Sequence, residues 1–330
     1  MPKLRLTLAC WNYDRTRALM EGRIPIEGVD LNYLNLVVEE TFFRMMRNQE
    51  FDVAEMSLSS YALSLFRDPQ PFIAIPVFPS RSFRHSGIFV NTDTGISEPK
   101  DLIGKRVGNP EYQLTAIVWI RGILQDEYGV PVNGVSYFRG GQEQPGRIEK
   151  AAISLPADIR LADIPGDKTL AKMLAAGEID ALYAPRAPST MGNGSGKVQH
   201  LFPDYPAVER EYYRKTKIFP IMHVIAIRRE VYERNPWVAQ SLYKAFVAAQ
   251  QEAYADLHEV AALKFMLPWL IPHVEETERM MGCDFWPYGF EPNVPTLRTF
   301  LRYSFEQGLS RRQLDPKELF APETLEAYKI

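Results

Sequence analysis

Short apolar runs alternate with helix-like segments along most of the chain. Leu4, Leu6 and Leu8 alternate with other residues, which predicts a strand over residues 3–10. Further strands are expected at 29–36, 51–56, 72–78, 87–91, 102–108, 179–184 and 219–227, and helices at 14–22, 39–48, from 57 onward, 109–129, 168–176, 236–262 and 295–307. This alternation is typical of an α/β protein with a mainly parallel sheet.

The clearest helix start is expected at Asn109. Asn109 would be the N-cap, Pro110 would be the first helical residue, and Gly129 would end the helix. The unpaired N–H groups of this first turn would attract an anion or a polar solute, so Gln113 and Thr115 are candidate ligand-binding residues.

Composition narrows the class of protein. A chain of 330 residues exceeds one ordinary core of about 100–150 residues, so two domains or one large α/β unit are expected. Hydrophobic residues at 46% and charged residues at 24% exclude disordered and fibrous classes. The 38 basic and 41 acidic residues leave a net charge of -3, which argues against a nucleic-acid partner.

The N-terminus and the two cysteines indicate the cellular compartment that is expected for the protein. Cys10 and Cys283 are too few for a disulfide framework and form no CxxC pair. No apolar stretch approaches the ~20 residues of a membrane span. If Met1 is the natural start, the short apolar run that follows is no secretion signal, and the protein is expected to be cytoplasmic.

Polar side chains gather where predicted strands end, which is where ligands bind in open α/β sheets. A carboxylate clamp with proton transfer would need guanidinium groups near an imidazole, as in the run from Arg81 to His85. The same run can also be a solvated basic turn. The candidate substrate-binding residues found in this way are Tyr13, Arg15, Ser57, Arg81, Arg84, Gln113, Thr115 and Arg186.

His85, His223 and Glu55 are the candidate catalytic residues. A histidine within an apolar strand, as His223 is, is more often a packed core residue than a catalyst. Glu55 can be a desolvated acid or a helix-capping partner. The histidines show no HxH, HxxxH or HExxH spacing, so no metal site is expected, although ligands from distant segments stay open. The glycine-rich loop 191–196 lacks a nucleotide-binding pattern and is interpreted as a surface loop.

The chain resembles the 4,5-dihydroxyphthalate decarboxylase family, whose fold is that of type II periplasmic substrate-binding proteins. The resemblance covers nearly the whole chain. It rests on 11–17 (WNYDRTR), 51–57 (FDVAEMS), 80–86 (SRSFRHS), 107–116 (VGNPEYQLTA), 119–122 (WIRG), 140–147 (GGQEQPGR), 176–182 (AGEIDAL), 185–188 (PRAP), 219–223 (FPIMH) and 287–289 (PYG).

The resemblance implies an α/β, two-lobed fold with a central cleft and a two-segment hinge. Residues 1–100 and 225–330 would form a discontinuous first lobe, and residues 101–224 the second. Arg147, in the GGxxxPGR run, joins the candidate substrate-binding residues. His85 and His223 are expected to face one another across the cleft as proton-transfer groups.

The resemblance implies a decarboxylase of phthalate degradation, part of aromatic catabolism. Arginines would anchor the carboxylates of a hydroxylated aromatic acid, and a histidine or Glu55 would transfer protons, with no cofactor expected. A binding protein that delivers an aromatic or pyrimidine-like solute to an ABC transporter is the alternative. A lyase of the kind that makes menaquinone precursors is a third candidate. The expected partner is a small aromatic acid, without nucleic acid or membrane, and assembly into a homo-oligomer is left open.

Overall fold

The computed structural model describes residues 2–147, 149–150, 153–192 and 196–326. The chain divides into two compact units. Unit 1 comprises Met1–Arg81, His223–Pro295 and Asp315–Ile330, and unit 2 comprises Ser82–Met222 and Thr296–Leu314. The sequence-based boundaries differ, because residues 82–100 and 296–314 belong to unit 2.

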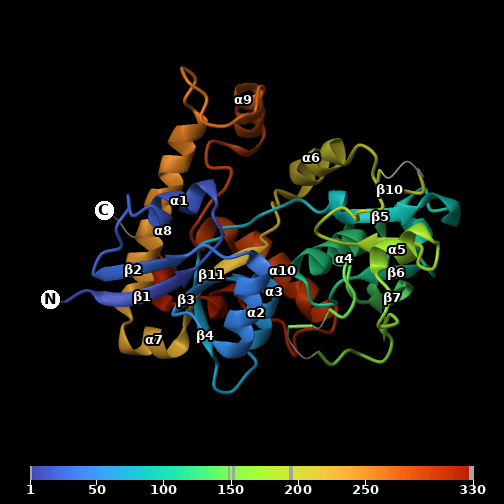
Figure 1. Cartoon of the computed structure of the whole chain (residues 1–330), viewed down its shortest axis with the longest axis horizontal. Helices are drawn as coiled ribbons and strands as arrows, with labels where there is room; N and C mark the ends of the chain where they lie inside the picture. Colours follow the sequence, from blue (N-terminus) through green and yellow to red (C-terminus); the bar gives the residue numbers. More distant parts are fainter. Residues whose placement is uncertain (1, 148, 151–152, 193–195, 327–330) are drawn as a thin grey trace. The chain divides into compact units, whose positions relative to one another are not determined.

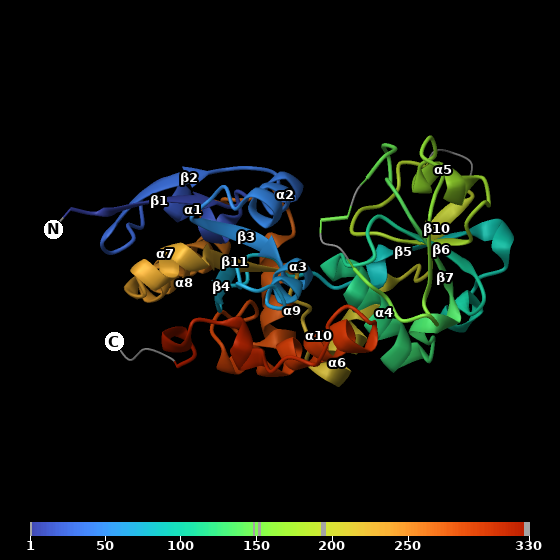
Figure 2. The same ribbon diagram turned by 90° about the horizontal axis from the view of Figure 1, so that it is seen from below.

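Unit 1 is built around one mixed sheet (Figures 1 and 2). Its strands are β1 (Leu4–Ala9), β2 (Val29–Leu34), β3 (Val53–Ser57), β4 (Phe72–Ile75) and β11 (His223–Arg228). Its helices are α1 (Asp14–Met20), α2 (Val38–Asn48), α3 (Leu58–Ser64), α7 (Arg229–Arg234), α8 (Trp237–Leu257) and α9 (Leu270–Met281). The strand order among the described residues is β2-β1-β3-β11-β4. β1 pairs in parallel with β2 and β3, and β11 runs antiparallel to both β3 and β4.

Unit 2 has its own sheet, with the order β10-β5-β9-β6-β7-β8 among the described residues. Its strands are β5 (Ile88–Asn91), β6 (Arg106–Asn109), β7 (Ser136–Arg139), β8 (Arg160–Asp163), β9 (Ala181–Tyr183) and β10 (Val198–His200). Its helices are α4 (Thr115–Tyr128), α5 (Leu170–Ala175), α6 (Tyr205–Thr216) and most of α10 (Val294–Glu306). The expected α/β class is therefore confirmed, with parallel pairing among β6, β7, β8 and β9.

The expected helix start at Asn109 is wrong. Asn109 is the last residue of β6, where it pairs with Arg139 of β7, and α4 begins at Thr115 with Leu114 as its N-cap. The asparagine is held in the extended ladder, so it is unavailable as a cap. The predicted C-terminal end of this helix is confirmed, because Gly129 adopts a left-handed conformation with φ 68° and ends α4.

Helix α10 completes the core of unit 2 by packing on α4. Trp119 lies fully buried against the rings of Phe300 and Tyr303, at centroid distances of 5.5 and 5.6 Å. The indole nitrogen of Trp119 also donates to the carbonyl oxygen of Ile221 at 2.9 Å. A segment that residues 223–295 of unit 1 separate from the rest of unit 2 in the sequence therefore supplies core residues to unit 2.

Gly122 lets these two helices approach closely. A Cβ atom at Gly122 would lie 2.1 Å from a ring atom of Tyr303. We expect Gly122→Ala to lower the free energy of unfolding by about 1–3 kcal/mol, because the buried tyrosine would have to move. Urea denaturation measures this effect. Gly166→Ala is the matched control, since a Cβ there meets nothing within 4 Å; equal midpoints for both variants would contradict the prediction.

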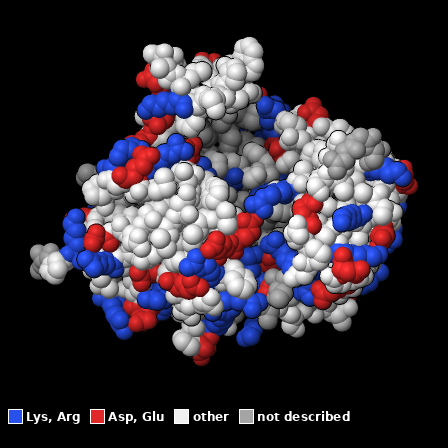
Figure 3. Space-filling model, in the orientation of Figure 1, with Lys and Arg blue, Asp and Glu red and all other residues white. Residues whose placement is uncertain are grey.

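The surface carries both signs of charge. On the face seen in Figure 3, basic and acidic side chains are intermixed. Across the part of the chain that the structure describes, no helix has the length and apolar character needed to span a bilayer.

Candidate functional site

Glu55 lies at the centre of a polar cluster in unit 1. It occupies the middle of β3, a strand whose five residues are all buried, and its own side chain is 0% exposed. A carboxylate in such a place is stable only if several donors surround it. The structure supplies these donors from two separate segments of unit 1.

The first donor is His223, whose Nδ1 lies 2.6 Å from Oε1 of Glu55. The strand register explains the contact. β11 runs antiparallel to β3, Ile225 pairs with Glu55, and His223 pairs with Ser57. His223 is therefore the diagonal neighbour of Glu55 on one face of the sheet, within reach of a long side chain. The ring of Phe42, from α2, packs edge-on against the imidazole at 4.7 Å.

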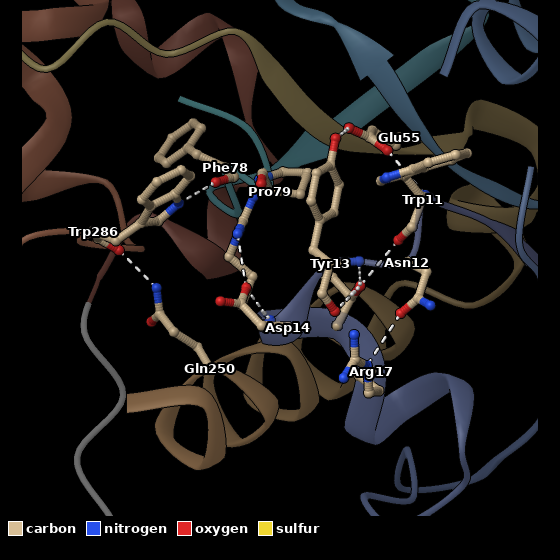
Figure 4. Close-up of polar contacts among 12 residues, drawn as sticks. Trp11, Asn12, Tyr13, Asp14, Arg17, Glu55, Phe78, Pro79, Gln250 and Trp286 are labelled. Atoms are coloured by element: carbon tan, nitrogen blue, oxygen red, sulfur yellow. Dashed lines mark hydrogen bonds and ion pairs between the residues drawn. The ribbon is translucent and has the colours of Figure 1, made fainter. Parts of the chain in front are cut away.

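The other donors belong to residues 10–13, which come directly after strand β1 in the sequence. The hydroxyl of Tyr13 donates to Oε1 of Glu55 at 2.7 Å, and the backbone N–H of Trp11 donates to Oε2 at 3.1 Å (Figure 4). The thiol of Cys10 lies 3.6 Å from Oε2. β1 is parallel to β3, so its carboxyl end brings residues 10–13 to the same edge of the sheet.

Burial and these hydrogen bonds set the protonation states of Glu55, Tyr13 and Cys10. Burial alone would raise the pKa of Glu55, but the charge and hydrogen bond of His223, with those of Tyr13 and Trp11, outweigh it and hold the pKa below its usual range. Burial and the charge of Glu55 raise the pKa of Tyr13 and of Cys10. Glu55 is therefore an acceptor at neutral pH, and Nδ1 of His223 carries the proton between them.

The outer nitrogen of His223 is available for chemistry. Nε2 has no hydrogen-bond partner among the described residues, and 17% of the side chain is exposed. An imidazole held by a carboxylate at one nitrogen and open at the other is suited to proton transfer. Ser57, also a predicted site residue, is buried at the N-cap of α3, where its hydroxyl accepts from the N–H of Ser60.

Arg15 lies beside this cluster, enclosed by aromatic rings. Its guanidinium carbon is 4.3 Å from the ring centre of Tyr13 and 4.2 Å from that of Trp286. Nε donates to the carbonyl oxygen of Pro79 at 2.6 Å, and one Nη donates to Asp14 at 2.8 Å. Arg15 is therefore fixed beside the tyrosine that contacts Glu55, and its contact with Asp14 is an ion pair.

The two predicted arginines of the run 80–86 differ from each other, and Arg81 belongs to unit 1 while Arg84 belongs to unit 2. Arg81 is buried, and it donates to the carbonyl oxygen of Pro287 and to the side chain of Asn293. Arg84 donates through Nε to the sulfur of Met222 at 3.1 Å, and burial lowers its pKa to about 10. The nearby charge of Glu209 acts in the opposite direction and partly offsets this lowering of the pKa of Arg84.

The predicted residues near α4 form a second, self-paired cluster in unit 2. Arg147 and Lys150 both form ion pairs with Glu111, whose side chain is 1% exposed. Glu149 accepts the backbone N–H groups of Tyr112 and Gln113 at 2.6 and 3.3 Å. A protein carboxylate thus occupies the position where an anion was expected. Thr115 is buried as the first residue of α4, and Arg186 is exposed between β9 and β10.

His85 lies inside unit 2. It is 1% exposed, and the rings of Tyr128, Phe202 and Tyr212 surround it at centroid distances of 5.3–5.9 Å. Both ring nitrogens are buried without a hydrogen-bond partner among the described atoms. The neighbours of His85 belong to unit 2 and those of His223 to unit 1, so their facing one another stays a prediction.

The buried His85 is expected to make stability depend on pH. Burial lowers its pKa from 6.5 to about 4. Between these values the unfolded chain binds a proton that the folded chain does not, so the free energy of unfolding falls as the pH falls. His85→Phe should remove up to about 3 kcal/mol of this loss. Urea unfolding of the wild type and of His85→Phe at pH 7 and 4.5 tests this prediction. Equal decreases in the free energy of unfolding for the two proteins would contradict it.

No group of three or more histidine, cysteine, aspartate or glutamate side chains is arranged to hold a metal ion within the described ranges. Trp286 and Phe42 were not among the predicted site residues. Both contact predicted ones, but only through tertiary packing. The predicted loop at 191–196 includes residues 193–195, which lie outside the described residues.

Comparison with known structures gives the class of fold. The periplasmic aliphatic sulphonate binding protein SsuA of Escherichia coli is 12% identical, with a TM-score of 0.52 over 98% of this chain and 99% of that one. The desulfurization enzyme DSZB is 16% identical, with a TM-score of 0.50 over 98% of each chain. These likenesses confirm the periplasmic-binding-protein-like fold that the sequence predicts.

Comparison of sequences gives the family. A 4,5-dihydroxyphthalate decarboxylase of Comamonas testosteroni is 44% identical over 330 residues, which is 100% of both chains. A second, from Pseudomonas putida, is 45% identical over 214 residues, or 65% of this chain and 83% of that one. The chain belongs to the 4,5-dihydroxyphthalate decarboxylase family, as its sequence motifs predict. No protein-family model matches the sequence.

Proposed function

We propose that this protein is a carboxy-lyase that releases CO2 from a hydroxylated aromatic acid of the 4,5-dihydroxyphthalate type. Membership of the decarboxylase family supports the reaction class. The observation that carries the assignment of the site is the 2.6 Å contact between His223 Nδ1 and the buried carboxylate of Glu55. This contact uses Nδ1, so Nε2 of His223 is the nitrogen that would act on the substrate.

The chemistry requires a proton at one ring carbon. In 4,5-dihydroxyphthalate each carboxylate lies para to a hydroxyl. Protonation of the carbon that bears the carboxylate interrupts the aromatic ring, and electrons from the para oxygen stabilise the cation that forms. The bond to the carboxylate then breaks, its electron pair restores the ring, and CO2 leaves. One proton is consumed, and it stays on the ring carbon.

In this proposal, His223 delivers that proton from Nε2. The charge of Glu55 stabilises the imidazolium before transfer and fixes its orientation through Nδ1. The hydroxyl of Tyr13 donates to Glu55, so its oxygen is left to accept a hydrogen bond from a ring hydroxyl. Arg15 is the proposed carboxylate anchor. We give His85 no role, because both of its nitrogens are buried.

The ring hydroxyl serves as the electron source, so we propose a reaction without an organic cofactor. The decisive assay supplies the purified chain with 4,5-dihydroxyphthalate and quantifies CO2 and 3,4-dihydroxybenzoate. In D2O the product should contain one deuterium on the carbon that lost the carboxylate. Binding of the substrate without CO2 release would instead support a binding protein and would overturn the proposal.

A further inference from the structure

Trp286 contacts Arg15 although the two residues are far apart in the sequence. Its ring centre lies 4.2 Å from the guanidinium carbon, and the ring of Tyr13 lies at 4.3 Å. Stacking of a guanidinium on an aromatic ring is attractive, by about 0.5–1 kcal/mol when exposed and about 2 kcal/mol or more when desolvated. The side chain of Arg15 is only 15% exposed, which places this contact nearer the stronger case.

Trp286 is itself fixed at both its ring and its backbone (Figure 4). The indole nitrogen donates to the carbonyl oxygen of Phe78 at 2.9 Å. Arg15 donates through Nε to the next carbonyl, that of Pro79. Gln250 and Tyr254 of α8 bind the backbone of Trp286 at 2.6 and 2.9 Å. Helix α8 and residues 78–79 therefore hold the indole ring and the guanidinium group against each other.

These contacts leave one edge of the guanidinium open. Nε binds Pro79 and Nη1 binds Asp14, while Nη2 has no hydrogen-bond partner among the described residues. Aromatic rings lie against the guanidinium, so a planar carboxylate is expected to approach in the plane of the guanidinium, along the Nη2 edge.

We propose that Trp286 is a positioning residue, which holds Arg15 so that its Nη2 edge binds a carboxylate of the aromatic substrate. This proposal rests on the proposed function, because it takes the substrate to be an aromatic acid. A positioning residue of this kind acts on substrate binding and leaves the proton transfer by His223 intact.

The test compares Trp286→Ala and Trp286→Phe with Trp269→Ala, a tryptophan of unit 1 that is 69% exposed. We expect Trp286→Ala to raise KM for 4,5-dihydroxyphthalate about 3- to 30-fold, with kcat changed less than about 3-fold. Trp286→Phe should recover most of the loss, because a ring remains. Trp269→Ala should behave as the wild type. An unchanged KM, or a fall in kcat alone, would overturn the proposal.

A double-mutant cycle with Arg15→Met shows whether Trp286 acts through Arg15. In the Arg15→Met background, Trp286→Ala should raise KM no further; additive effects would overturn the proposal. Calorimetric titration with phthalate, which has the carboxylates but no hydroxyls, keeps the two proposals separate. A wild type that binds phthalate more tightly than Trp286→Ala, but releases no CO2 from 4,5-dihydroxyphthalate, would contradict the proposed function while supporting the positioning role of Trp286. Equal affinities of wild type and Trp286→Ala for phthalate would overturn the positioning role of Trp286 alone.

Discussion

Replacement of His223 by asparagine is expected to lower the rate of CO2 release about 10²–10⁴-fold, the usual contribution of a general acid. Asparagine can place an amide nitrogen near the position of Nδ1, so the hydrogen bond to Glu55 can persist. The group at Nε2 that we propose as the proton donor is lost. Steady-state kinetics on 4,5-dihydroxyphthalate measures the effect, and the fall should be in kcat.

A second histidine of unit 1 provides the matched control. His258, the C-cap of α8, contacts Glu278 of α9 through Nε2 at 2.8 Å, but these side chains are 48% and 24% exposed, whereas Glu55 is fully buried. His258→Asn should leave the rate unchanged. A His223→Asn enzyme that keeps its full rate would show that the proton comes from another group.

Glu55→Gln is expected to lower the rate about 10³–10⁴-fold, because the amide removes the charge that stabilises the imidazolium and can impose the wrong tautomer. The same change tests stability. The pKa of Glu55 is lowered on folding, so its ionised form stabilises the folded chain above the unfolded pKa of 4.5, and this contribution is lost as the pH falls through the folded value.

Two measurements separate the roles of Glu55. The difference in urea midpoint between wild type and Glu55→Gln should be constant near neutral pH and shrink in acid. Glu55→Ala should destabilise by about 3–5 kcal/mol, since it leaves buried donors without a partner. Glu278→Gln is the control for both the rate of CO2 release and the urea midpoint. A Glu55→Gln enzyme with normal kcat would limit this carboxylate to a structural role.

The sequence predicts the individual members of the site better than their arrangement. Glu55 and His223 stand out because each is a polar residue in an apolar strand. Their contact depends on the antiparallel register of β11 against β3, which joins residues 168 positions apart. Local periodicity identifies strands but contains no information on which strands pair.

The errors have the same origin. Asn109 has the composition of a helix cap, but pairing with β7 keeps it in a strand. His85 follows two arginines in a run that suits a ligand-binding loop, yet three aromatic residues from distant segments enclose it. Arg147 suits an anion, but Glu111 already neutralises it. In each case tertiary contacts override a local preference.

The placement of α10 in unit 2 has a consequence for synthesis on the ribosome. Phe300 and Tyr303 cover Trp119, and the side chain of Gln307 binds Arg121 at 2.8 Å and the carbonyl oxygen of Val118 at 2.9 Å. The middle of the chain therefore emerges without its last core helix. At about 5–20 residues per second, the nascent unit 2 must wait several seconds, with Trp119 uncovered, for residues 296–314. During that interval the indole of Trp119 lacks the cover that Phe300 and Tyr303 give it in the folded chain.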